Sequence, residues 1–311
     1  MGVDPTDAPR SDVPPVERES VARPASRVAA ATAGSRVGGL FREAVFAALI
    51  GASWQADAFF LAFRIPNLLR DVFAEGALAS AFVPTLAKTQ AQEGPERAFQ
   101  LARRTMGTLV LVTSVVALLG IVFAPQVVSV IAPHAPAKTR ELTVLLTRIM
   151  FPFLPLVAAA AVCMGVLNVH RRYFVPALAP MFFNVVAVIG GGALLLLGWD
   201  DPSRVEGAVV VWAILVVIGG FAQVLVQLPT LRRVGWRGRP QVDPRFRDPA
   251  LRQIAKRMGP IVLSVAGVNV MLLIITALSS QGIGWPSWLS YAFRLVHLPI
   301  GLIGVALGTV V

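Results

Sequence analysis

The chain has 311 residues, of which 56% are hydrophobic and only 14% are charged, and its formal net charge is +11. Soluble domains are less apolar and about a quarter charged, so this composition excludes an ordinary soluble domain and favours a helical membrane protein. Cys163 is the only cysteine, which excludes an intramolecular disulfide and a thiolate metal cluster.

Long apolar runs predict about eight membrane-spanning helices. Residues 1–27 precede them, contain five prolines and no apolar run, and are predicted to be a disordered cytoplasmic tail. Prolines interrupt the second and fourth of these spans, which is tolerated in membrane helices whose neighbours satisfy the freed backbone groups. The predicted spans are 28–51, 56–87, 105–132, 142–169, 174–198, 207–231, 259–280 and 288–311.

The basic residues outside these spans lie mainly on one side. Nineteen occupy the tail and the even-numbered loops, nine of them in the linker 232–258, whereas the odd-numbered loops hold only Lys138, Arg140 and Arg204. Positive loops face the cytoplasm, so the tail is predicted to be cytoplasmic. This placement explains the basic excess without nucleic acid as a partner.

Charged residues inside the predicted spans are the most informative feature. Each arginine at the centre of a span costs about 2.5–3.5 kcal/mol on insertion, so such residues indicate a water-filled cavity, an ion pair or a ligand. The first two spans hold all four acids and four of the six arginines. The residues are Arg36, Arg42, Arg64, Arg70, Arg148 and Arg294, with Glu43, Asp57, Asp71 and Glu75.

Spacing indicates which of these charges can meet. Asp57, Arg64 and Asp71 repeat at intervals of seven and form one polar stripe, to which Glu75 belongs. Arg42 and Arg70 lie off the helix faces on which these charges align, so they are better placed to reach a ligand. The alternative is that all these charges form ion pairs between helices.

The last two arginines stand apart from this stripe. Arg148 is expected to extend to the membrane interface. Arg294 has no acid near it in the sequence, so a bound anion is a natural partner.

Motifs of common enzyme classes are absent. The sequence contains no His-Glu-x-x-His, no phosphate-binding Gly-x-x-x-x-Gly-Lys and no nucleophile elbow. We therefore expect neither an enzyme nor a bound cofactor or metal.

Several motifs around these charges resemble the MurJ (MviN) lipid II flippases of the multidrug/oligosaccharidyl-lipid/polysaccharide exporter superfamily. The resemblance covers about 26–311 and rests on Ser35-Arg-Val-Gly-Gly-Leu-Phe-Arg-Glu43, Ala56-Asp-Ala-Phe-Phe60, Arg64-Ile-Pro-Asn-Leu-Leu-Arg70 and Phe73-Ala-Glu-Gly-Ala77. It implies a fold of fourteen helices in two lobes, with 28–231 as the first lobe and 259–311 as the start of the second. Family members continue beyond this point, so the remainder of the second lobe is expected to be absent, in a fragment or a truncated gene product.

The resemblance also implies a site. Arginines matching Arg36, Arg42, Arg70 and Arg294 bind the diphosphate of the undecaprenyl-linked peptidoglycan precursor in this family. Ser35 is then expected near a lateral portal, Asp57 as a gate or a partner of Arg42, and Glu75 as the acid of the Ala-Glu-Gly motif. Guanidinium groups suit this substrate because they bind phosphate oxygens in a bidentate manner.

The predicted function is transport of this lipid precursor across the bacterial inner membrane by alternating access. Its partners would be the precursor, membrane lipids and proteins of cell-wall synthesis. Three alternatives stay open. They are a flippase or exporter for another substrate of the superfamily, a non-transporting scaffold for wall synthesis and, least favoured, a membrane enzyme.

Overall fold

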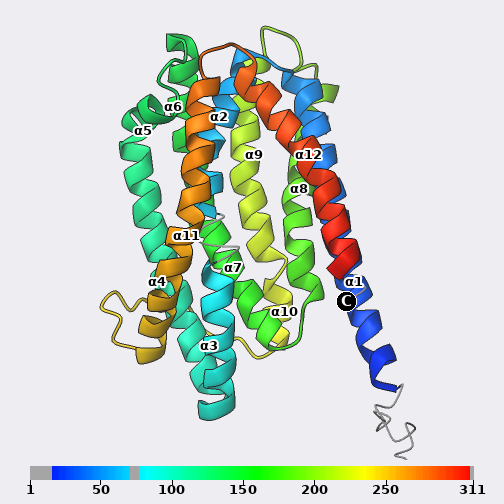
Figure 1. Ribbon diagram of the computed structural model, residues 1–311, viewed down its shortest axis with the longest axis vertical. Helices are drawn as coiled ribbons and strands as arrows, with labels where there is room; N and C mark the ends of the chain where they lie inside the picture. Colours follow the sequence, from blue (N-terminus) through cyan, green and yellow to red (C-terminus); the bar gives the residue numbers. More distant parts are fainter. Residues whose placement is uncertain (1–15, 71–76, 309–311) are drawn as a thin grey trace, which may run out of the picture.

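The computed structural model describes residues 16–70 and 77–308, and these residues form an all-helical bundle (Figure 1). In Figure 1, α7 and α9 run through the middle of the bundle, α4 and α11 flank one side, and α1, α8 and α12 flank the other. The helices are α1 (Val16–Ile50), α2 (Trp54–Arg70), α3 (Ala77–Glu93), α4 (Pro95–Val122), α5 (Ala124–Ile131), α6 (Ala137–Met150), α7 (Phe153–Val169), α8 (Phe174–Leu196), α9 (Val205–Leu225), α10 (Leu228–Arg233), α11 (Pro249–Ser279) and α12 (Trp285–Gly308).

Each of the eight predicted spans corresponds to one helix or to two consecutive helices. The third span divides at Phe123 and the fourth at Phe151, and a proline stands at or next to the start of the following helix in both cases. Proline lacks the N–H that a continuous helix needs, but it fits the first turn of a new one. Residues 71–76, including Asp71 and Glu75, lie outside the described residues.

Length and apolarity alone identify fewer spans among the described residues than the eight predicted. Four helical stretches qualify, and the two halves of α11, which meet at a 45° bend, make a fifth. The helices α1, α2, α3 and α12 are not among them. The four that qualify are Pro95–Val122, Ala137–Val169, Phe174–Leu196 and Val205–Arg233.

The first helix begins earlier than the sequence predicted. It starts at Val16, directly after Pro14-Pro15, so residues 16–27 of the segment predicted to be disordered are helical here. A proline pair is compatible with a helix start, and Glu17, Arg18 and Glu19 are residues that the first turns of a helix accommodate. Residues 1–15 lie outside the described residues.

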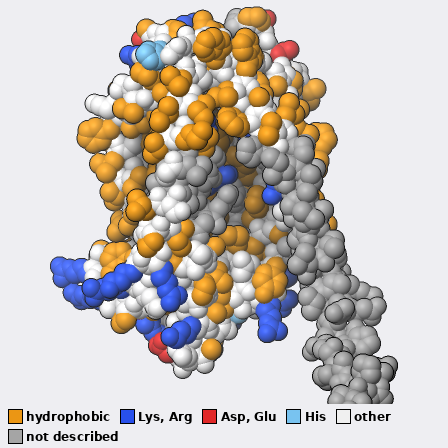
Figure 2. All heavy atoms as spheres, viewed as in Figure 1, with side chains coloured by type: hydrophobic (Ala, Val, Ile, Leu, Met, Phe, Trp, Pro, Cys, Tyr) orange, Lys and Arg blue, Asp and Glu red, His pale blue; other side chains and the backbone are white. Residues whose placement is uncertain are grey.

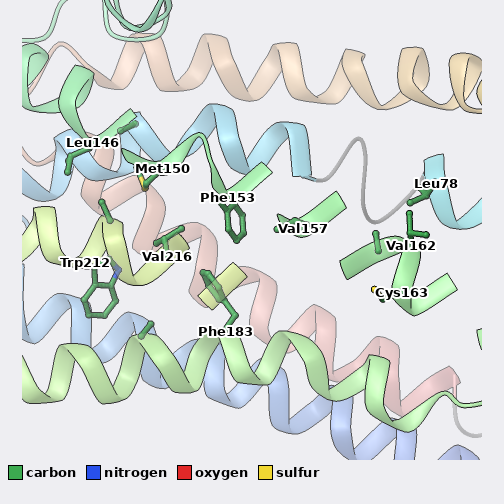
Figure 3. Close-up of a cluster of buried hydrophobic side chains, with 14 of the residues drawn as sticks. Leu78, Leu146, Met150, Phe153, Val157, Val162, Cys163, Phe183, Trp212 and Val216 are labelled. Atoms are coloured by element: carbon green, nitrogen blue, oxygen red, sulfur yellow. The ribbon is translucent and has the colours of Figure 1, made fainter. Parts of the chain in front are cut away.

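The helices α8 and α9 pack closely against each other and against α7. A side chain at Gly191 of α8 would collide with Trp212 of α9, and one at Gly220 would collide with Phe153 of α7. Trp212, Phe153 and Phe183 therefore fill the space between these helices, as Figure 3 shows. Hydrophobic side chains also cover much of the outer flank, while Lys and Arg gather at the lower end in Figure 2. This distribution is expected of a helical bundle in lipid.

The linker between α10 and α11 is fastened to α4. The buried carboxylate of Asp248 accepts hydrogen bonds from both terminal nitrogens of Arg97 (2.8 and 3.0 Å) and from Arg104 (2.8 Å), and it caps α11 at the Ala250 N–H (3.0 Å). The Gln241 N–H also donates to the Arg103 carbonyl at 3.0 Å. Part of the basic linker 232–258 is therefore an ordered, packed segment, and its last residues belong to α11.

Asp248→Ala should destabilise this attachment by about 2–4 kcal/mol, because a helix cap is worth about 1 kcal/mol and a charge-assisted hydrogen bond about 1.5–3 kcal/mol. Hydrogen exchange of residues 238–252 measures the change. Glu93→Ala is the matched control, since Glu93 also pairs with Arg97 but is exposed, and it should change exchange little. Equal exchange in both variants would contradict the attachment.

The same carboxylate gives the attachment a pH dependence. Burial favours the neutral acid, but the hydrogen bonds from Arg97 and Arg104 outweigh this effect and lower the pKa of Asp248 to about 2. Because this pKa lies below its unfolded value of about 3.9, the stabilisation is complete above about pH 5 and is lost progressively as the pH falls through about 2.

Candidate functional site

An ion cluster joins α1 to α12. The Glu43 carboxylate accepts hydrogen bonds from Arg42 (2.7 Å) and from Arg294 (2.9 Å), and both contacts use the same oxygen. The side chains of Arg42 and Glu43 are each only 14% exposed, whereas that of Arg294 is 48% exposed. One acid thus compensates two arginines, which leaves the cluster with a net positive charge.

Residues of α8 hold Arg42 in place. Its second terminal nitrogen donates to Asn184 Oδ1 at 3.1 Å, and its guanidinium carbon lies 5.2 Å from the centre of the Phe183 ring. Asn184 in turn donates to the Ser35 carbonyl at 2.9 Å and so ties α8 back to α1. Together with the hydrogen bond to Glu43, these contacts hold the Arg42 guanidinium in one position, although a free arginine side chain can adopt many rotamers.

Two cavities meet at this cluster and share Arg42, Phe183 and Arg294. The first has a volume of about 470 Å³ and lies among aromatic side chains of α1, α2, α8, α9 and α12, including Phe46, Phe60 and Trp212. The second has a volume of about 510 Å³ and lies among residues of α1, α2, α7, α8, α9 and α12. Lys and Arg side-chain atoms are visible inside a hollow of the face shown in Figure 2.

The second cavity brings together residues that are far apart in the sequence. All four arginines expected at the site, together with Ser35, line it. Several guanidinium groups around one cavity of this size can bind an anion that carries more than one charge. The four are Arg36, Arg42, Arg70 and Arg294.

Asp57 takes a different place from the one expected for a partner of Arg42. Its buried carboxylate accepts from the Ser287 N–H at 3.0 Å, from the Ser287 hydroxyl and from the Gly284 N–H, at the start of α12. The acid that pairs with Arg42 is Glu43, which corrects that part of the expectation. Asp57 instead connects α2 to the N-terminal end of α12.

Arg64 and Arg148 make contacts outside the ion cluster. Arg64 lines the first cavity, and its Nε donates to the Thr276 hydroxyl of α11 at 2.7 Å. Arg148 is exposed and donates to the Ile121 carbonyl at 3.3 Å, as a residue at the outer surface would. Glu75, which was expected at the site, lies outside the described residues.

Sequence reasoning missed some residues of the site. Glu43 was not expected as the acid that pairs with Arg42, and Arg294, which has no acid near it in the sequence, also contacts Glu43. Asn184 and Gln227 are buried polar residues within otherwise apolar stretches, and that contrast could have identified them as cavity residues. Among the described residues, no group of three His, Cys, Asp or Glu side chains could hold a metal ion.

Comparison with known proteins identifies relatives of this chain. Residues 46–311 match the family model described as lipid II flippase MurJ. The chain is 37% identical over 281 residues to a lipid II flippase MurJ of Burkholderia cenocepacia, covering 89% of this chain and 53% of that protein. It is 33% identical over 279 residues to a probable lipid II flippase MurJ of Buchnera aphidicola, covering 89% and 52%. The chain therefore spans about half the length of these relatives.

Solved structures show the same fold. A lipid II flippase MurJ in an inward closed conformation matches with a TM-score of 0.71 and 24% identity, over 88% of this chain and 55% of that one. A protein described as MATE, in complex with MaD3S, matches with a TM-score of 0.66 and 15% identity, over 91% of this chain and 63% of that one. At these identities the likeness concerns the arrangement of helices.

Proposed function

Because the chain belongs to the MurJ family of lipid II flippases, we propose that it carries the cytoplasm-facing substrate site for moving lipid II across the bacterial inner membrane by alternating access. In this proposal the N-terminus is cytoplasmic, 28–231 is the first lobe, 232–258 joins it to the start of a second lobe, and the chain performs no covalent chemistry. The diphosphate enters the arginine-lined cavity while the lipid tail stays in the bilayer.

The observation that carries the proposal is the convergence of four arginines on one cavity. Their guanidinium groups come from three helices, α1, α2 and α12, and the second cavity touches all of them. Glu43 neutralises part of this positive charge and so lowers the repulsion between the arginines. The positive charge that remains attracts a multiply charged anion. A cationic drug would meet repulsion in the same place.

Binding and translocation of lipid II test the proposal in two separate steps. The purified chain in lipid nanodiscs should bind lipid II saturably, and undecaprenyl diphosphate should compete with it, because both present a diphosphate to the arginines. Neutral undecaprenol should not compete. No saturable binding of lipid II would contradict the proposed site.

Translocation distinguishes a flippase from a scaffold. Proteoliposomes with the chain should expose labelled lipid II to a membrane-impermeant quencher faster than empty liposomes do. Binding without accelerated exposure would favour a non-transporting role for these 311 residues. Stronger competition by another polysaccharide-linked lipid than by lipid II would favour a different substrate of the superfamily.

A further inference from the structure

Two glutamines lie on the wall of the second cavity, one helical turn apart, and the arginine site makes no use of them. Gln223 belongs to the last turns of α9, and Gln227 immediately precedes α10. Both stand among apolar residues in the sequence, so two neighbouring amides at this place require a physical explanation.

The amide of Gln227 is held in one orientation. Its Nε2 donates to the Ala160 carbonyl at 3.2 Å and to the Gln223 carbonyl at 2.9 Å, so the amide nitrogen must face these two acceptors. The side chain is almost fully buried, and within the described part of the chain its Oε1 accepts no hydrogen bond. Buried acceptors are normally satisfied, so the unpaired oxygen marks this part of the cavity wall as suited to a polar occupant.

Gln223 complements this acceptor. Its side chain is partly exposed towards the same cavity and has no hydrogen-bond partner among residues 16–70 and 77–308, although its backbone carbonyl binds Gln227. It therefore offers a donor and an acceptor beside the unpaired oxygen of Gln227. The arginines of this cavity can only donate. The amide oxygen of Asn184 already accepts from Arg42, and its amide nitrogen already donates to the Ser35 carbonyl.

We infer that Gln223 and Gln227 form a neutral hydrogen-bonding subsite for the amide and hydroxyl groups of the substrate head group, separate from the arginines that bind its diphosphate. The inference rests on the proposed function, because it assumes that a sugar- and peptide-bearing lipid enters the second cavity. In this inference, residues at the end of α9 recognise the polar head group, and the arginines of α1, α2 and α12 attract the negative charge of the diphosphate.

Two lipids that differ only in the head group test this subsite. Binding of lipid II and of undecaprenyl diphosphate, which lacks the sugars and peptide, is measured with the chain in nanodiscs. Gln223→Leu should weaken lipid II binding about 5- to 10-fold and leave the Kd of undecaprenyl diphosphate unchanged. Gln253→Leu, on the exposed face of α11, is the matched control and should change neither Kd.

The outcomes separate the subsite from the proposed function. Unchanged lipid II binding by Gln223→Leu, with normal binding of both lipids by the parent chain, would overturn the subsite alone. Equal weakening of both lipids would also overturn it, since the glutamine would then act on the diphosphate or on the fold. Failure of the parent chain to bind either lipid would reject the proposed function and the subsite with it. Gln227→Leu should repeat the selective loss, and thermal unfolding checks that losing its bonds to Ala160 and Gln223 leaves the bundle folded.

Discussion

Arg42→Ala should weaken the binding of lipid II by about 100-fold, which corresponds to about 2.7 kcal/mol. Arg42 lines both cavities and is oriented by Glu43, Asn184 and Phe183, so its guanidinium is already in position before a ligand arrives. Removing one member of a desolvated charge pair typically costs about 2–5 kcal/mol, and here it also removes a phosphate-binding fork. Equilibrium binding in nanodiscs measures the loss.

Two further variants show whether this effect is specific. Arg148→Ala removes an exposed arginine outside the cavities and should leave the Kd within about twofold. Glu43→Gln has the opposite expectation, since it frees Arg42 and Arg294 from their shared acid and should tighten binding at low salt. Weaker binding by Glu43→Gln would mean that the acid positions the arginines more than it neutralises them. Unchanged binding by Arg42→Ala would remove Arg42 from the site.

The apolar runs were enough to predict the helices, because lipid requires the backbone of each span to satisfy its own hydrogen bonds. The exact breaks were harder to predict. Proline marks those at Phe123 and Phe151, but other prolines, such as Pro66, remain inside a helix. Whether a proline ends a helix or bends it depends on neighbouring helices that the sequence does not specify locally.

The four arginines that line the second cavity were named from motifs, whereas their partners were not predicted. Adjacent residues on a helix do not normally face each other, so Glu43 was not an expected partner of Arg42. The contact forms because both side chains turn towards the same interior region, where α12 also supplies Arg294. The acceptor role of Asp57 could not be predicted from the sequence either, because its donors include backbone N–H groups, which almost any residue can supply.

Those donors place Asp57 at a junction between the two proposed lobes. Asp57 lies in the first turn of α2, and Gly284 and Ser287 lie at the start of α12, where unpaired N–H groups and the helix dipole favour a negative charge. Tyr291 of α12 adds a hydrogen bond to the Gly51 carbonyl at 3.0 Å. These contacts hold α2 and α12 together about one helical turn from Phe60 and Ser290, which line the first cavity, and this supports the proposal that Asp57 belongs to a gate.

Asp57→Ala should therefore open this junction and increase access to the first cavity about 30-fold, if the lost hydrogen bonds to a charged acceptor are worth about 2 kcal/mol. The reporter is Ser290→Cys, at a position that lines that cavity, and the measurement is its labelling rate with a membrane-impermeant maleimide added outside. The native Cys163 is buried and should react slowly. Glu206→Gln is the matched control, because Glu206 is an exposed acid at the start of α9, the same end of the bundle, and pairs only loosely with Lys138 at 3.9 Å. If Asp57→Ala labels no faster than Glu206→Gln, the carboxylate stabilises α12 without controlling access, and the gate must be sought elsewhere.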